Sequence, residues 1–294
     1  MMIPRRITII GLGLIGCSLG MALKRAKGSE VEITGTSRTE ETIKIALQRG
    51  AIDRPQPKLK EAVSGAELVI IATPISAIPE VFQEIREHLP SGSIVTDTAS
   101  TKAQVVRWAA EFLPPQVRFV GGHPMAGKER AGPLEAEASL FERKAYCLIP
   151  SPAADERAME ACVALSKAVG AFPIVLSAEE HDKIAAGASH ILILLSAALI
   201  SATSAHPSWP LIARIAGNGF RDLSRLASGS PRLHFDICIT NKENIIEWLD
   251  RYMDELRRYR EILAGSSQEL LEILERARDK RERWIRFRAE GREL

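Results

Sequence analysis

The chain has 294 residues, of which 46% are hydrophobic, 26% charged and 5% aromatic, with a formal net charge of +2. This length allows two domains with buried cores, and the balanced charge gives no reason to expect a nucleic acid or an anionic membrane as partner. The four cysteines are scattered, without the close pairs or nearby histidines of a zinc site, so we expect a reducing compartment and no metal.

The first 175 residues alternate short runs rich in β-branched residues with helical patterns, which is typical of βαβ units around a parallel sheet. The N-terminus runs straight into the first of these runs, so we expect no signal peptide and a cytoplasmic protein. The sequence predicts strands at Ile7–Ile10, Val31–Thr36, Leu68–Ala72, Ile94–Thr96, Arg118–Val120, Ala145–Ile149 and Phe172–Val175.

A glycine-rich turn follows the first predicted strand and opens the first predicted helix. In the sequence GLGLIG (11–16), Gly11 permits a tight turn, Gly13 lets the backbone approach a pyrophosphate, and Gly16 lets helix and strand pack closely. Leu14 and Ile15 then begin the helix, whose free N–H groups face the phosphates. The pattern predicts a Rossmann-type dinucleotide site.

The end of the second predicted strand indicates which dinucleotide is bound. NAD-binding proteins usually place Asp or Glu here for the ribose hydroxyls, whereas this chain has Ser37, Arg38 and Thr39. The hydroxyls can donate hydrogen bonds to a 2′-phosphate, and Arg38 can pair with it and stack on adenine. We therefore predict NADP in preference to NAD, the alternative being that Arg38 is a surface arginine and either cofactor serves. Thr39 is also placed to cap the next helix.

Three later strand ends carry polar groups toward the same ligand crevice. Thr73 and Pro74 end the third long strand and either line the nicotinamide side or form a plain turn. DTASTK (97–102) and GGHPMAG (121–127) follow the next two. Alcohol oxidation needs a base for the hydroxyl proton, a role that His123 and a hydrogen bond from Ser100 could fill. The alternative is that His123 is a capped loop residue.

After Ser177 the patterns are helical to the end of the chain, so we predict a Rossmann-type doubly wound parallel sheet (residues 1–176) followed by an all-helical domain (residues 177–294). Residues 184–213 contain no Asp, Glu, Lys or Arg. Their length would permit a membrane span, but the serines and His190 within the run favour a helix buried in a domain or dimer interface. The stretch 268–288 is amphipathic and reads as a solvated helix face.

The two strand-end motifs, with EHD (180–182), SH (189–190), GFRD (219–222) and NKEN (241–244), resemble the prephenate/arogenate dehydrogenase family over almost the whole chain. The resemblance implies oxidative decarboxylation of prephenate or arogenate on the route to tyrosine, with hydride transfer to NADP or NAD. It implies His123 as the base with Ser100 beside it, and a homodimer formed by the helical domain.

By the same resemblance, Arg225 holds the ring carboxylate, and Asp222, one helical turn earlier, orients it. His190 matches a substrate-side position, although it could equally be a buried helix histidine. Many prephenate-using members carry a second histidine where this chain has Ile193, which tilts the expectation slightly toward arogenate or toward a substitute contact from Lys128.

Two other classes of protein remain compatible with the sequence. One is another two-domain NADP-dependent reductase, of the β-hydroxyacid dehydrogenase or imine reductase type, which shares the glycine motif and the layout. The other is a non-catalytic NADP-sensing protein, which would bind cofactor without turnover.

Overall fold

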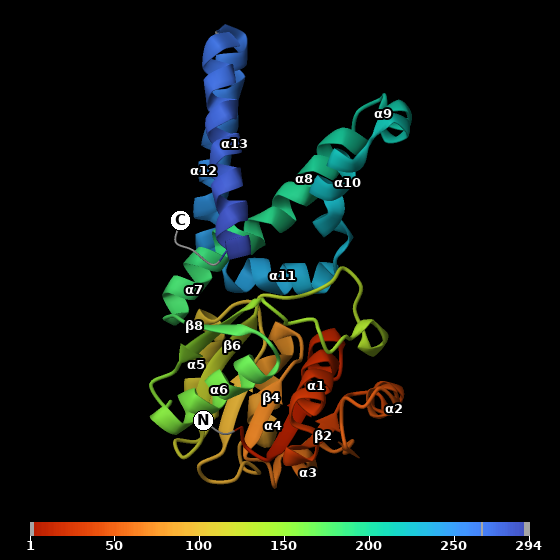
Figure 1. The fold of residues 1–294 in the computed structure, drawn as a ribbon, viewed down its shortest axis with the longest axis vertical. Coiled ribbons are helices and arrows are strands. Elements are labelled where there is room, and N and C mark those ends of the chain that lie inside the picture. Colours follow the sequence, from red (N-terminus) through yellow and green to blue (C-terminus); the bar gives the residue numbers. More distant parts are fainter. Residues whose placement is uncertain (1–2, 266, 291–294) are drawn as a thin grey trace. The chain divides into compact units, whose positions relative to one another are not determined.

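The structure is a computed structural model and describes residues 3–265 and 267–290 (Figure 1). Contacts within the chain divide it into two compact units, Met1–Ile245 and Ile246–Leu294. The first unit contains the whole sheet and the helices up to α11. The predicted domain boundary after residue 176 falls inside this unit, between strand β8 and helix α7, and stays a prediction.

The first unit is built on an eight-stranded sheet in the order β3-β2-β1-β4-β5-β6-β7-β8. Its inner strands are buried on both faces, which explains their runs of isoleucine, leucine and valine. The order reverses at β1 and β4, which makes this the switch point where doubly wound sheets bind ligands. The strands are β1 (Arg6–Ile10), β2 (Glu32–Thr36), β3 (Arg54–Pro55), β4 (Leu68–Ile71), β5 (Ile94–Asp97), β6 (Arg118–Pro124), β7 (Ala145–Pro150) and β8 (Phe172–Val175).

The sheet differs from the predicted one in two respects. The two-residue strand β3 was missed because it is too short to show a periodicity. Strand β6 runs on to Pro124, four residues further than predicted, because it pairs antiparallel with β7 and places His123 opposite Cys147. His123 therefore lies in a strand and not in the loop that follows it, and the sheet contains one antiparallel pair.

Helices cover both faces of the sheet, as Figure 1 shows. The helices α1, α2 and α6 pack on one face, and α3, α4 and α5 on the other. Helix α2 begins as predicted, with the Thr39 hydroxyl accepting a hydrogen bond from the Thr42 amide. The bounds are α1 (Leu14–Lys27), α2 (Glu40–Gln48), α3 (Leu59–Val63), α4 (Ile78–Ile85), α5 (Ala103–Phe112) and α6 (Glu156–Ala168).

No strand follows β8 in the described part of the chain, in agreement with the predicted helical half. Ser177 and Glu180 form a capping box that starts α7. A π-turn, η4 (Ala186–His190), then joins α7 to the apolar helix α8. The helices of this region are α7 (Ala178–Ala185), α8 (Ile191–Ser204), α9 (Trp209–Ile215), α10 (Asn218–Ser224) and α11 (Pro231–Thr240), with the 3₁₀ turn η5 (Arg225–Ser228) between the last two.

The apolar helix is less buried than the sequence suggested. The stretch Ala178–Ser204 has a mean hydropathy of 2.0 in its most apolar window, and only 33% of that window is buried in the single chain. By length and composition alone it could cross a membrane. Its buried side packs on the turn η5, where the Ser196 hydroxyl accepts a hydrogen bond of 2.8 Å from the Ala227 amide.

The second unit consists of helix. It holds most of α12 (Lys242–Gly265) and all of α13 (Ser267–Glu290), which matches the predicted amphipathic stretch 268–288. Ile262 and Ile273 are buried in it, while its arginines up to Arg288 are solvent-exposed.

Candidate active site

A cavity of about 770 Å³ lies at the carboxyl ends of β1, β2 and β4. Its wall includes Gly11 and Gly13 from the first turn, Ser37 and Arg38 after β2, and Thr73 and Pro74 after β4 (the segment 10–13 contributes Ile10 and Leu12 as well). The structure thus brings together, in one cavity, six of the ten residues that we predicted to bind the dinucleotide. Leu14, Ile15, Gly16 and Thr39 lie beside it and do not line it.

The three glycines of the first turn have distinct surroundings that fit the roles expected of them. Gly11 has φ +94°, and a Cβ on it would lie 2.5 Å from the Ala72 carbonyl oxygen. A Cβ on Gly16 would collide with the Gly11 carbonyl at 1.9 Å. Gly13, in contrast, has open space beside it and caps α1 without any side-chain hydrogen bond. The backbone amides at this helix N-terminus are therefore available to phosphate oxygens.

The adenosine end of the cavity is rich in cations. Arg38 is joined there by Lys58 and Lys60, and no carboxylate follows directly on β2. Lys58 is paired with Glu61 at 2.9 Å. The Thr39 hydroxyl is occupied as the helix cap of α2, so its side chain serves the fold at this point. The two lysines were missed because they lie at the start of the short helix α3, after the unrecognised strand β3, where no motif marks them.

The other end of the cavity carries a buried polar atom without a partner. The Thr73 hydroxyl is buried and makes no hydrogen bond within the described chain. A buried hydroxyl left in this state is costly unless a ligand completes it, so it fits a bound nicotinamide better than a plain turn. Beside it, Asp236 of α11 accepts hydrogen bonds from the Ser76 amide at 3.2 Å and the Ser76 hydroxyl at 2.7 Å, which fixes α11 against this end.

His123 lies two strands along from Thr73, roughly 10 Å away by ordinary strand spacing. It is only 7% exposed, and its Nδ1 lies 2.9 Å from Nε2 of His181. Burial, together with the nearby His181, Lys102 and His190, lowers the pKa of His123 well below its usual 6.5. The imidazole is therefore neutral at pH 7, as a general base must be.

The loop carrying Ser100 is tied to the strand carrying His123 by a buried ion pair. Lys102 and Asp97 pair with no exposed surface. Lys102 Nζ also donates to the Gly122 carbonyl at 2.7 Å, and the Gly122 amide donates to Asp97 at 3.1 Å. Ser100, three residues after Asp97, makes no side-chain hydrogen bond within the described residues. Its predicted bond to His123 remains a prediction.

His190 faces the same region from the π-turn η4. The Asn241 side-chain amide donates to the Asp182 carbonyl at 2.8 Å and to His190 Nδ1 at 3.0 Å. Because Nδ1 is an acceptor here, the ring proton lies on Nε2, which is buried and lacks a partner. Burial lowers the pKa of His190 to about 4. His190 is thus a neutral donor whose ring lies against the Ser100 backbone, which opposes the lowering of its pKa; its role toward the substrate remains a prediction. Asn241 was missed as a site residue, although the motif that contains it was noticed.

The predicted partners of the substrate carboxylate pair differently from our expectation. Arg225 forms an ion pair with Glu129, in the loop that follows β6, and Asp222 pairs with Arg221 at 3.2 Å. The expected Asp222–Arg225 pair does not form, because each of the two side chains is paired with a different partner. Arg225 is exposed in the single chain.

Lys128 is already engaged within the chain. Its Nζ donates to the Glu135 carbonyl at 2.9 Å and pairs with Glu137 at 2.6 Å. Its role as a substitute contact for the substrate remains a prediction. Among the described residues, no group of three or more His, Cys, Asp or Glu is placed to hold a metal ion.

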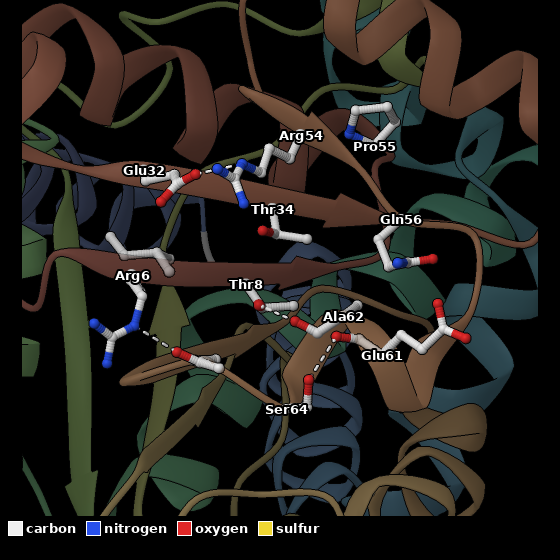
Figure 2. Close-up of a pocket in the computed structure, with 13 residues that line it drawn as sticks. Arg6, Thr8, Glu32, Thr34, Arg54, Pro55, Gln56, Glu61, Ala62 and Ser64 are labelled. Carbon is white, nitrogen blue, oxygen red and sulfur yellow. Dashed lines mark hydrogen bonds and ion pairs between the residues drawn. The ribbon is translucent and has the colours of Figure 1, made fainter.

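A second cavity, of about 280 Å³, lies against β1, β2, β3 and α3 (Figure 2). Each of its charged groups has an ion-pair partner: Arg54 pairs with Glu32 inside the lining, whereas Arg6 and Glu61 pair with residues outside it, and Thr8 donates to the Ala62 carbonyl. The residues that we predicted for substrate or cofactor lie outside its lining. We therefore assign the chemistry to the first cavity and to the strand ends beside it.

This glycine turn, cavity and buried base on a doubly wound sheet define a dinucleotide-dependent dehydrogenase. The chain matches the family models "Prephenate dehydrogenase, nucleotide-binding domain" over residues 19–175 and "Prephenate dehydrogenase, dimerization domain" over residues 177–276. The chain belongs to the prephenate dehydrogenase family.

Individual relatives agree with this assignment. The chain is 34% identical to prephenate dehydrogenase of Bacillus subtilis, over 94% of this chain and 75% of the relative. Among solved structures, prephenate dehydrogenase from Aquifex aeolicus, in complex with hydroxyphenyl propionate and NAD+, superposes with a TM-score of 0.87 at 27% identity, over 95% of this chain and 98% of the other. Synechocystis arogenate dehydrogenase gives 0.81 at 29% identity, over 95% and 99%. Nothing in these likenesses favours the other reductases or the non-catalytic reading.

Proposed function

We propose that this protein oxidises prephenate or arogenate with loss of carbon dioxide, with NADP as the preferred hydride acceptor. The observation that carries the proposal is a buried neutral histidine, His123. It lies on β6, two strands away from β4, where the dinucleotide cavity ends. A bound dinucleotide supplies the nicotinamide that accepts the hydride.

The residues of this chain divide the remaining work. His123 Nδ1 is bonded to His181, so Nε2 is left to accept the proton of the substrate hydroxyl as that carbon is oxidised. The planar guanidinium of Arg225 can donate two parallel hydrogen bonds to a carboxylate. To bind the substrate carboxylate, Arg225 would give up its ion pair with Glu129. Loss of the ring carboxylate as carbon dioxide then restores aromaticity and makes the reaction irreversible.

The preference for NADP is supported by the cation-rich adenosine end. Ser37 can donate to a 2′-phosphate, and Arg38 and Lys60 can neutralise it. A carboxylate that would repel the phosphate is missing at the position after β2.

The choice of substrate is supported by Ile193. It is buried at 8% exposure, at the position where many prephenate-using members carry a histidine. An apolar residue offers nothing to the keto acid side chain of prephenate, so we propose arogenate as the better substrate. We also propose a cytoplasmic homodimer, with the exposed side of α8 to α11 covered by a second copy.

One experiment tests reaction, substrate and cofactor together. NADPH formation is followed with prephenate, with arogenate and with neither, and each assay is repeated with NAD. We expect turnover with arogenate above prephenate and with NADP above NAD. A lack of turnover in all four combinations would reject the proposal.

The variant His123→Asn separates this reading from the other reductases. We expect kcat to fall by roughly 10²–10⁴-fold, because the general base is lost. NADP binding, measured by fluorescence titration, should stay within about threefold because His123 lies outside the cavity lining. Retained turnover would favour a different base and a different reductase.

A further inference from the structure

His123 is the first member of a buried hydrogen-bonded chain of three side chains. Its Nδ1 lies 2.9 Å from His181 Nε2, and His181 Nδ1 lies 2.8 Å from Asp182 Oδ1. His181 and Asp182 are each 1% exposed. The two histidine rings meet edge to face, with centroids 5.1 Å apart and planes at 70°. These contacts are confined to protein atoms, away from solvent.

Asp182 determines the direction of the hydrogen bonds among these three side chains. The carboxylate accepts from the Lys102 amide at 2.7 Å and the Ala103 amide at 2.9 Å. These are free amides at the N-terminus of α5, whose partial positive charge stabilises a carboxylate anion. An ionised carboxylate can only accept, so His181 Nδ1 must carry the proton that it receives.

The tautomer of each ring then follows. With its proton on Nδ1, neutral His181 has a bare Nε2, which accepts from His123 Nδ1. His123 in turn has its proton on Nδ1 and a bare Nε2. This is the tautomer that a base requires, because only an unprotonated nitrogen can accept the substrate proton.

We propose that His181, held by Asp182, is a positioning residue that fixes the tautomer and the orientation of His123. The proposal rests on the proposed function only in taking His123 as the base. In the reaction the hydroxyl proton moves to His123 Nε2, while the Nδ1 proton stays in its bond to His181. The second histidine thus accepts a stronger hydrogen bond as His123 becomes cationic.

The charged groups around His123 explain why an acceptor is needed there. The surrounding groups are Asp97 at the end of β5, Lys102 at the start of α5, Cys147 of β7 and His190 of η4, in addition to His181 and Asp182 on α7. Burial, a positive charge on His181, and the neighbouring Lys102 and His190 all oppose a positive charge on the His123 ring, so His181 can assist only as a neutral acceptor. The hydrogen bond from His123 to His181, which Asp182 holds in place, stabilises the His123 cation from the side away from the substrate.

Two substitutions of His181 by residues of similar size test this role. In His181→Gln, the amide oxygen can still accept from His123 Nδ1, whereas His181→Leu has no acceptor. We expect the Leu variant to lose at least 100-fold in kcat with KM and NADP affinity within about threefold, and the Gln variant to retain at least tenfold more kcat than Leu. The acidic limb of kcat/KM should move to lower pH in the Leu variant and stay in place in the Gln variant, because the cation has lost its acceptor.

A merely structural role predicts equal losses in both variants, in parallel with their melting temperatures, and that result would overturn the proposal. Full activity of a folded Leu variant would also overturn it. His88→Gln, an exposed histidine on the surface of the first unit, is the matched control and should leave kcat unchanged.

The tautomer can be read without turnover. The protein has six histidines, so selective ¹⁵N-histidine labelling gives a short set of ring signals, assigned with the variants above. We expect His123 and His181 to carry the proton on Nδ1 in the wild-type protein, and His123 to show mixed tautomers in His181→Leu. A proton on His123 Nε2 in the wild-type protein would refute the positioning role. This readout holds even if neither substrate is oxidised, so the two proposals can fail separately.

Discussion

Asp97 at the end of β5 and Lys102 at the start of α5 are charged residues whose side chains have no exposed surface. Burial lowers the pKa of Lys102, and the Asp97 charge opposes that shift. Such a pair gains little net stability over an apolar one, because the cost of desolvating two charges cancels most of their attraction. What it provides is geometry. Its hydrogen bonds to the Gly122 backbone hold the Ser100 loop beside the strand that carries His123.

The effect of this pair on stability can be measured by a double-mutant cycle. Lys102→Met leaves a buried carboxylate without its cation, so we expect a loss of roughly 3–5 kcal/mol in the free energy of unfolding in urea. Adding Asp97→Asn removes the unpaired charge and should restore part of that loss. A double variant less stable than Lys102→Met alone would contradict this account.

At the scale of elements, the end of β2 and the start of α1 decide how the dinucleotide is held. Both reach the cavity because adjacent parallel strands β1 and β2 end at the same edge of the sheet. Gly11 and Gly13 of the glycine turn and Ser37 and Arg38 after β2 line the same cavity, and we expect them to meet the phosphates and the ribose respectively. We therefore expect cofactor preference to depend on this strand end together with the start of α3, which carries Lys58 and Lys60.

Changing this strand end should change the cofactor preference. In Arg38→Ala we expect kcat/KM for NADP to fall by roughly 10–100-fold, the value of one or two charge-assisted hydrogen bonds, with NAD changed by less than about threefold. Ser37→Asp should act in the same direction and add repulsion. Lys44→Ala, which removes an exposed cation from α2, is the control. Equal losses with both cofactors would show that Arg38 does not contact the 2′-phosphate.

At the scale of the whole molecule, helices α8 to α11 leave large apolar side chains exposed. Leu211 is 63% exposed, Ile215 83% and Leu223 72%. An apolar surface of this kind is typical of an interface between subunits, and the family model that covers it is a dimerization domain. Arg225 follows closely in the chain, so we expect dimerisation to alter its exposure.

A charge on this surface should weaken the dimer. We expect Ile215→Glu to raise the dimer dissociation constant by at least about 100-fold, because an unpaired carboxylate would be buried. Light scattering across a protein dilution series would show this as a shift toward 32 kDa. Leu47→Glu, at an exposed leucine of α2, is the control and should leave the mass unchanged. An unchanged dimer in Ile215→Glu would place the interface elsewhere.

The sequence by itself determined the βαβ half, the glycine turn and the helical half, because each is encoded by local periodicity or by a backbone requirement at one residue, such as the turn at Gly11. Two strand-end motifs were also enough to single out His123 and Ser100. The extent of β6 could not be found in this way, because it depends on pairing with β7.

Only the tertiary structure decided which groups face one another. The contact of His123 with His181, 58 residues later, and the pairing of Arg225 with Glu129 join segments that are distant in the chain. A sequence motif shows which residue types are present, but it does not show how a helix is oriented on the sheet and therefore which side chains it brings into contact. Hydrogen bonds and ion pairs act over a few ångströms, so their partners are fixed by packing and not by neighbourhood in the sequence.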